Sequence, residues 1–137
     1  MAGLPVEIPE ILKTAKIIAV VGLSDKPERP SYGVASYLLE HGYTIVPVNP
    51  NISEWKGLKA YASLADIPKS VKVDVVDIFR KSGDVPPVVD GAIKVKAKTV
   101  WMQLGIVNEA AAEKARRAGL NVVMDRCMRI EHQKLAR

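Results

Sequence analysis

The sequence predicts a doubly wound α/β domain, with a mainly parallel sheet of five strands and helices on both faces. Three observations favour it. Short runs rich in valine and isoleucine alternate with longer segments of helical spacing. The short runs are almost continuously apolar, which is typical of parallel strands covered on both faces. A length of 137 residues with 48% hydrophobic residues suits one compact domain, expected to span residues 1–137.

The elements follow in order along the chain. The strands are expected at residues 17–22, 44–48, 73–78, 99–102 and 121–124. Helical spacing marks residues 9–16, 32–41, 84–95, 108–118 and 127–135, with a short helical segment at 64–67. Gly42 and Gly119 each follow one of these helices, where glycine readily takes the left-handed conformation that ends a helix. Ligand contacts are expected at the carboxyl ends of the strands, where the strand order reverses beside the first strand.

Composition and charge narrow the classes of function. The 20 lysines and arginines exceed the 15 aspartates and glutamates, and this net charge of +5 favours an anionic ligand. The basic residues are scattered and the 5% of aromatic residues form no stacking pattern, so we expect no nucleic-acid partner. The chain has no apolar run long enough to span a membrane and no recognisable signal peptide, so we expect a cytoplasmic protein without membrane contact. Cys127 is the single cysteine, which excludes an internal disulfide and argues against a metal site.

The loop after the first expected strand carries the strongest functional signal. It runs from Gly22 and Ser24 to a helix start near Ser31. The amides and positive dipole end of such a helix start suit a phosphate. Ser31 is expected as the N-cap, Gly33 would allow close approach of a ligand or strand, and Arg29 could engage a phosphate with two hydrogen bonds. The alternative is a stiff surface turn, made by the prolines and serines, that binds nothing.

Two common nucleotide motifs are missing. The sequence contains neither G-x-G-x-x-G nor the Walker sequence G-x-x-x-x-G-K-[ST]. Asn49 follows the second expected strand, where an NAD site usually has an acidic residue for the ribose. The sequence therefore disfavours NAD and gives no motif for ATP or GTP hydrolysis.

Three stretches resemble a known family: VVGLSDKPERPSYGVASYLLEHGYTIVPVNPN, DVVDIFRKSGDVPPVVDGAI and VWMQLGIVNEAAAEKARRAGLNVVMDRC. They are similar to the small stand-alone CoA-binding proteins, which in turn resemble the N-terminal, Rossmann-like domain of the succinyl-CoA synthetase alpha subunit. The resemblance implies coenzyme A as cofactor. It also implies binding residues at the ends of the first three strands: Gly22, Leu23, Ser24, Arg29, Ser31, Gly33, Val48, Asn49, Pro50, Phe79, Arg80 and Lys81.

We therefore expect a module that binds coenzyme A or acyl-CoA without catalysis of its own. The synthetase carries its phosphohistidine on a further domain, and His41 and His132 match no such motif, so ligase activity is not transferred. An alternative is a subunit of an enzyme acting on a CoA thioester or another nucleotide, with catalytic groups supplied by a partner. A partner subunit and a homo-oligomer both stay open, and binding of nucleic acid by the basic face is a third, weaker alternative.

Other chemically suggestive residues have ordinary structural interpretations. Cys127, between Arg126 and Arg129, is expected to be buried, and the alternative is a thiol that forms a mixed disulfide with CoA. His41 is expected to interact with its own helix end. No pair of aspartates is spaced for acid–base catalysis, so no catalytic residue is predicted. Trp101 is expected in the core, with Gln103 within reach of the site.

Overall fold

The computed structural model describes residues 7–135. Five parallel strands form the main sheet: β1 (Ile17–Val21), β2 (Thr44–Val48), β5 (Val75–Ile78), β6 (Thr99–Met102) and β7 (Asn121–Val123). Their order is β2-β1-β5-β6-β7, so the chain reverses direction across the sheet beside β1. The predicted doubly wound, Rossmann-like α/β fold is confirmed, and the reversal places the expected binding crevice at the carboxyl ends of β1, β2 and β5.

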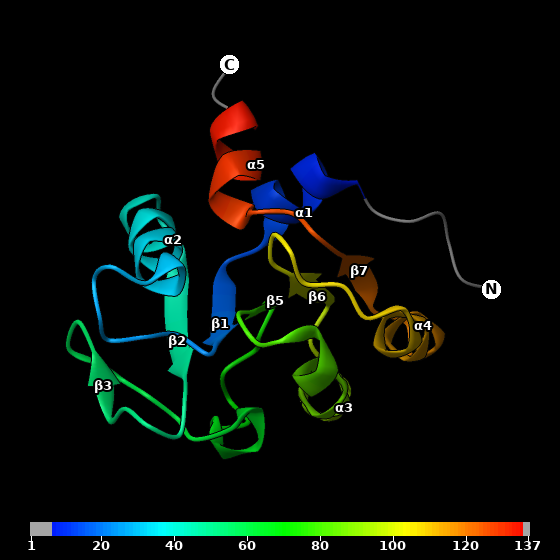
Figure 1. The fold of residues 1–137 in the computed structure, drawn as a ribbon, viewed down its shortest axis with the longest axis horizontal. Coiled ribbons are helices and arrows are strands. Elements are labelled where there is room, and N and C mark those ends of the chain that lie inside the picture. Colours follow the sequence, from blue (N-terminus) through cyan, green and yellow to red (C-terminus); the bar gives the residue numbers. More distant parts are fainter. Residues whose placement is uncertain (1–6, 136–137) are drawn as a thin grey trace.

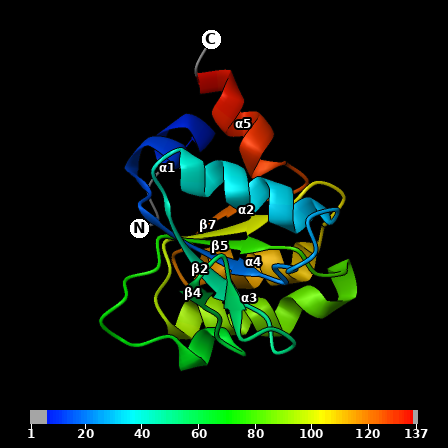
Figure 2. The same ribbon diagram turned by 90° about the vertical axis from the view of Figure 1, so that its left-hand side faces the viewer.

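Helices cover the sheet on both sides (Figures 1 and 2). One face packs against α1 (Ile8–Thr14), α2 (Pro30–Glu40) and α5 (Met128–Leu135), and we call it the α2 face. The other packs against η1 (Leu64–Asp66), α3 (Val85–Lys94) and α4 (Glu109–Arg117), and we call it the α3 face. A short turn of helix, η2 (Ser82–Asp84), leads into α3.

The strands are apolar on both sides because both sides are covered. In β1, Ile18 and Val20 face the α2 side, while Ala19 and Val21 face the α3 side. All four are buried. Trp101 in β6 is fully buried on the α2 face, which confirms it as a core residue. The continuous apolar runs thus reflect two cores that share one sheet.

The expected elements are present with small shifts at their ends. The largest shifts are of two residues, at the end of α1, the start of α2 and the start of β5, which was expected from residue 73 and begins at Val75. Just before it, one carboxylate oxygen of Asp74 accepts hydrogen bonds from the amides of Lys16 and Ile17, each at 2.9 Å. Asp74 therefore fastens the start of β1. Gly42 and Gly119 have φ values of +95° and +91°, as expected at helix ends.

A small hairpin was not predicted from the sequence. It consists of β3 (Glu54–Trp55) and β4 (Leu58–Lys59) joined by Lys56 and Gly57, both with positive φ. The signal was weak because Lys-Gly is a much less typical two-residue turn than Asn-Gly. Trp55 is buried and meets the ring of Tyr32 edge-on, with 5.5 Å between centroids. The hairpin thus packs on the first turn of α2.

No helix within residues 7–135 is long and apolar enough to cross a membrane.

Candidate functional site

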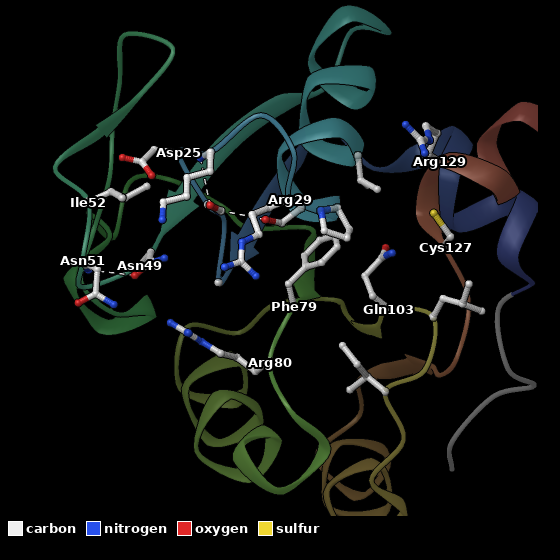
Figure 3. A pocket seen from close by; sticks show the side chains of 18 of the residues that line it. Asp25, Arg29, Asn49, Asn51, Ile52, Phe79, Arg80, Gln103, Cys127 and Arg129 are labelled. Carbon is white, nitrogen blue, oxygen red and sulfur yellow. Dashed lines mark hydrogen bonds between the residues drawn. The ribbon is translucent and has the colours of Figure 1, made fainter.

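A cavity of about 880 Å³ opens at the carboxyl edge of the sheet. Figure 3 shows its lining side chains, which come from the ends of β1, β2, β5 and β6 and from the beginnings of α2 and α5. Sites for small molecules typically measure about 300–1,000 Å³. The cavity therefore has room for a ligand of nucleotide size, at the reversal of strand order that the fold predicts as a site.

Gly22 lies at the end of β1 and contacts the ends of β2 and β5, the other two strands at which binding residues were expected. Its amide donates to the carbonyl of Val48 at 2.8 Å, and its φ is +87°. A Cβ atom here would collide with the carbonyl oxygen of Phe79 and approach Nε of Arg80 to 3.4 Å. Only glycine fits, because both the backbone conformation and the space exclude a side chain.

The loop from Gly22 to α2 is held by its two serines. The hydroxyl of Ser31 accepts a hydrogen bond from the amide of Ser24 at 3.0 Å, and the hydroxyl of Ser24 accepts one from the amide of Lys26 at 3.1 Å. The prediction of Ser31 as N-cap is wrong. Pro30 takes the first helical position, for which its fixed φ is suited, so the cap falls on Arg29.

Arg29 leaves the start of α2 without a side-chain cap, because its own side chain makes no capping hydrogen bond. Arg29, Pro30 and Ser31 all line the cavity. The first turn of α2 therefore borders the cavity with backbone amides and the positive end of the helix dipole. Such a helix start stabilises a negatively charged group.

Asn49 connects this loop with the turn after β2. Its side-chain nitrogen Nδ2 donates a hydrogen bond to the carbonyl of Leu23 at 3.0 Å, and its side-chain oxygen Oδ1 accepts one from the backbone amide of Asn51 at 2.9 Å. Asn49 is 9% exposed and Leu23 is fully buried. An acidic residue could not make both contacts, because it lacks the donating NH₂ group. Asn49 thus positions the two loops.

The charge of the cavity is strongly positive. Lys26, Arg29, Arg80 and Arg129 line it, against a single acidic residue, Asp25. Arg29 and Arg80 extend from opposite sides toward the same part of the cavity (Figure 3). Two guanidinium groups beside an uncapped helix start suit a diphosphate, since arginine matches phosphate oxygens in pairs.

Gly33 serves a contact between helices. A Cβ atom at this position would lie 3.4 Å from Nη1 of Arg129, which comes from α5. We expected a ligand or a strand to lie close to Gly33, and the group that lies there is the side chain of Arg129. The missing side chain at Gly33 lets α5 place this third guanidinium group over the start of α2.

A second cavity of about 500 Å³ adjoins the first on the α3 face. Val21, Val48, Pro50 and Leu64 give it an apolar lining, and Arg80 lines both cavities. Arg80 therefore stands at the junction between a positively charged space and an apolar one. Such a pair of spaces suits a ligand that has a flat apolar part next to its phosphates.

The residues implied by the resemblance divide between these spaces. The first cavity is lined by Gly22, Ser24, Arg29, Ser31, Asn49, Phe79 and Arg80, and the second by Val48, Pro50 and Arg80. Leu23 contributes its carbonyl to Asn49. Three of the implied residues line neither cavity: Leu23, Gly33 and Lys81.

Most residues at one end of the first cavity were not predicted from the sequence. Leu104, Ile106 and Ile130 line it, together with Gln103 and Cys127. Leu104 and Ile130 are 63% and 43% exposed, which is unusual for such apolar side chains. The expectation that ligands gather at carboxyl ends of strands applied to β6 as well, and would have found Leu104. The residues of α5 gave no comparable signal, because that helix reaches the cavity only through its tertiary packing.

Gln103 anchors α5 at this end of the cavity. Its side-chain oxygen accepts a hydrogen bond from the amide of Met128 at 3.0 Å. Cys127 lies beside this contact and is 8% exposed, as expected for a structural cysteine, yet it lines the cavity. The mixed disulfide with CoA therefore stays a hypothesis.

The aspartates near β5 have separate environments. Asp74 binds backbone amides at the amino edge, and Asp84 precedes α3 at the opposite edge. Asp77 is fully buried, and neither of its carboxylate oxygens has a hydrogen-bond partner within the described residues. Burial raises the pKa of Asp77 well above its usual range. Within residues 7–135, no group of three or more His, Cys, Asp and Glu side chains could hold a metal ion.

The two histidines lie together at the other end of α2. His41 contacts the carbonyl oxygen of Tyr37 through Nδ1 at 2.7 Å, which fits its expected interaction with the helix end. The hydroxyl of Tyr37 lies 2.8 Å from Nδ1 of His132. Burial, and secondarily His41, lower the pKa of His132. Neither histidine lines the first cavity.

Comparisons with known proteins agree with this geometry. A family model described as "CoA binding domain" matches residues 16–133. The uncharacterized protein YneT of Bacillus subtilis is 43% identical over 126 residues, which cover 92% of each chain. A solved structure of a hypothetical protein from Pyrococcus horikoshii OT3 is 48% identical, with a TM-score of 0.91 over 95% of this chain and 90% of that one.

A longer relative is an enzyme subunit. The alpha subunit of an ADP-forming acetate–CoA ligase, Acetate--CoA ligase I of Pyrococcus furiosus, is 30% identical over 130 residues. The match covers 83% of this chain and only 28% of the ligase subunit.

Proposed function

The chain belongs to the CoA-binding domain family, and from this premise we propose that it binds coenzyme A or an acyl-CoA through the loop between β1 and α2. Residues 1–137 act as one binding domain, with no catalytic residue of their own. The observation that carries the proposal is the uncapped start of α2, which borders a cavity of about 880 Å³ between Arg29 and Arg80.

The diphosphate of CoA lies at the start of α2. The backbone of residues 22–24 and the first turn of α2 offer amides, while Arg29 and Arg80 neutralise the phosphate charge. Ser24 and Ser31 hold the shape of this loop through their hydrogen bonds to backbone amides. Asn49 keeps the loop against the turn after β2.

The remaining parts of CoA extend to the two sides. The adenosine occupies the apolar second cavity beside Val48 and Pro50, with Arg80 at the junction of the two cavities and Phe79 in the lining of the first. Lys81, which is exposed next to Arg80, adds positive charge for the 3′-phosphate. The pantetheine arm follows the first cavity toward Gln103 and the exposed apolar side chains of Leu104 and Ile130.

Calorimetric titration tests this proposal. CoA should bind with a Kd well below about 1 mM, and NAD should bind much more weakly. Arg29→Ala and Arg80→Ala should each weaken CoA binding by about 10- to 100-fold, because each removes a charged hydrogen-bonding group. Arg116→Ala is the matched control, since Arg116 is exposed on α4. Equal binding of NAD, or unchanged affinity in Arg29→Ala, would reject the proposed site.

A second candidate is a subunit that works with a catalytic partner. It is favoured by the ligase relative, which is named a subunit and is much longer than this chain. In that case the purified protein alone would leave a panel of acyl-CoAs intact, and a co-purifying chain would be needed for turnover. Turnover by the isolated chain would contradict both candidates, because each assigns it no catalytic residue.

A further inference from the structure

A separate concave surface lies at the edge of the sheet where β5 and β6 begin. It is a cavity of about 640 Å³ between the segment leading into β5 and the end of α3. Figure 2 shows the segment of residues 65–74 (green) on the opposite side of the molecule from the loop that follows β1 (blue). This surface shares no lining residue with the first cavity and is therefore distinct from the proposed phosphate site.

The lining of this cavity has two chemical parts. Buried and half-buried apolar side chains form its floor: Ile67, Val71, Val73 and Val95. Exposed lysines surround that floor: Lys69, Lys72, Lys94, Lys96 and Lys98. We call these nine residues the lysine groove. Its lysines come from two segments of the chain, one before β5 and one at the end of α3, so positive charge borders the floor from both segments.

The charge of the groove is unbalanced. It collects five of the chain's 20 basic residues, and its lining contains no acidic residue. The nearest carboxylate that pairs with it is Asp74, with Oδ1 3.5 Å from Nζ of Lys98. The other oxygen of Asp74 already accepts two backbone hydrogen bonds. A cleft lined by one sign of charge concentrates ligands of the opposite sign.

Several anionic ligands fit this lining poorly. Arginine and aromatic side chains, which recognise phosphates and bases, are missing from the described lining, and this disfavours a nucleic acid or nucleotide. A flat membrane surface would not reach a concave apolar floor. A ligand with one charge would pair with only one of five lysines. Carboxylates in an extended chain, with apolar groups between them, match both the floor and the lysines.

We propose that the lysine groove binds an acidic segment of a partner protein. Aspartate or glutamate side chains of that segment pair with the lysines on both sides, and its apolar side chains contact the valines and isoleucine of the floor. Lysine suits such a partner because its flexible ammonium group pairs with carboxylates in many geometries. The groove and the proposed phosphate site lie at opposite edges of the sheet, and the cavity of the groove shares only Ala65 and Lys94 with the lining of the second cavity.

Fluorescence anisotropy with a short labelled peptide of alternating glutamate and leucine tests the proposal, at about 0.15 M salt, where distant exposed charges are screened. This peptide should bind at least tenfold more tightly than peptides of alternating glutamate and serine or serine and leucine. The double variant Lys72→Glu/Lys96→Glu should lose at least tenfold in affinity. Lys13→Glu/Arg116→Glu is the control, because it changes the net charge equally at exposed positions of α1 and α4.

A second variant tests the apolar floor. Val71→Gln keeps every lysine and should still weaken binding of the glutamate–leucine peptide severalfold. Titration with CoA should give the same affinity in wild type and in all these variants, which separates this proposal from the proposed function. The proposal is overturned if the glutamate–serine peptide binds equally well, if a single-stranded oligonucleotide binds more tightly, or if Lys72→Glu/Lys96→Glu retains wild-type affinity.

Discussion

On the α3 face, the helix that follows β6 is capped by its own sequence, whereas on the α2 face the helix that follows β1 is not. The side chain of Asn108 accepts a hydrogen bond from the amide of Ala111 at 2.9 Å and so closes the start of α4. Arg29 holds the same place before α2 and makes no such bond. A side-chain cap satisfies an amide of the first helical turn, whereas an uncapped start leaves that amide able to bind a ligand.

Buried polar groups differ between the two faces. Within residues 7–135, the buried side-chain atoms without hydrogen-bond partners belong to Ser36, Trp55 and Asp77. Ser36 lies on α2, Trp55 packs in the core of the α2 face, and Asp77 alternates with Ile78 so that it points to that face too. Each such group lowers stability. The face that borders the proposed phosphate site thus has more buried polar groups without partners, as is common near binding sites.

The largest effect is expected at the glycines that precede the two helices. Gly22→Ala should destabilise the protein by about 2–4 kcal/mol, because it adds a collision with the Phe79 carbonyl to an unfavourable φ. It should also abolish CoA binding. Gly105, before α4, is the matched control: its φ is +85° and a Cβ atom would meet nothing within 4 Å. Urea unfolding should show a cost of only about 1 kcal/mol for Gly105→Ala. Equal costs for the two variants would contradict a special role of the β1 loop.

A side-chain cap introduced before α2 should raise the stability of the protein and weaken CoA binding. Arg29→Asp places a carboxylate at the N-cap, so the ligand-free protein should gain about 0.5–1 kcal/mol in unfolding free energy. The same carboxylate repels phosphate and competes for the amides, so CoA affinity should fall by about 100-fold or about 2.7 kcal/mol. Urea unfolding and calorimetry measure the two effects. A variant that keeps its affinity for CoA would show that the start of α2 does not hold the phosphates.

The buried carboxyl of Asp77 should make the free energy of unfolding depend on pH. Its raised pKa means that the folded protein holds a proton which the unfolded chain releases above about pH 4. The contribution of Asp77 to stability is therefore fully present below that pH and is lost as the pH rises toward the folded-state pKa, by up to about 1.4 kcal/mol per pH unit. Asp77→Asn has no charge to bury, so its stability relative to wild type should increase between pH 4 and 8. Urea unfolding over this range would disprove the assignment if the difference stayed constant.

The smallest effect is expected at the helix that caps itself. Asn108→Ala should destabilise the protein by about 1 kcal/mol through loss of the N-cap hydrogen bond. CoA affinity should not change, because Asn108 lies outside the lining of both cavities. Thermal unfolding and calorimetry provide the check. Weaker CoA binding in this variant would mean that the two helix starts are coupled, and the contrast between the faces would then be incomplete.

The sequence by itself determined the five parallel strands, the reversal beside β1 and the candidate loop that leads from Gly22 into a helix near Ser31. These followed from apolar runs, helix signals and a glycine-led turn, which act over a few residues. Ser31 shows the limit of such local signals, because Pro30 moved the helix start and freed its hydroxyl to hold the amide of Ser24.

Only the tertiary structure decided what borders the site from a distance. Arg129 and Ile130 reach the first cavity because α5 packs across α2, and Arg80 joins two cavities because β5 pairs with β1. The five lysines of the lysine groove looked scattered along the chain and meet only when α3 packs beside the segment before β5. The reason is physical: a local pattern records which way a side chain leaves its own helix or strand, while its neighbours across space depend on how those elements pack.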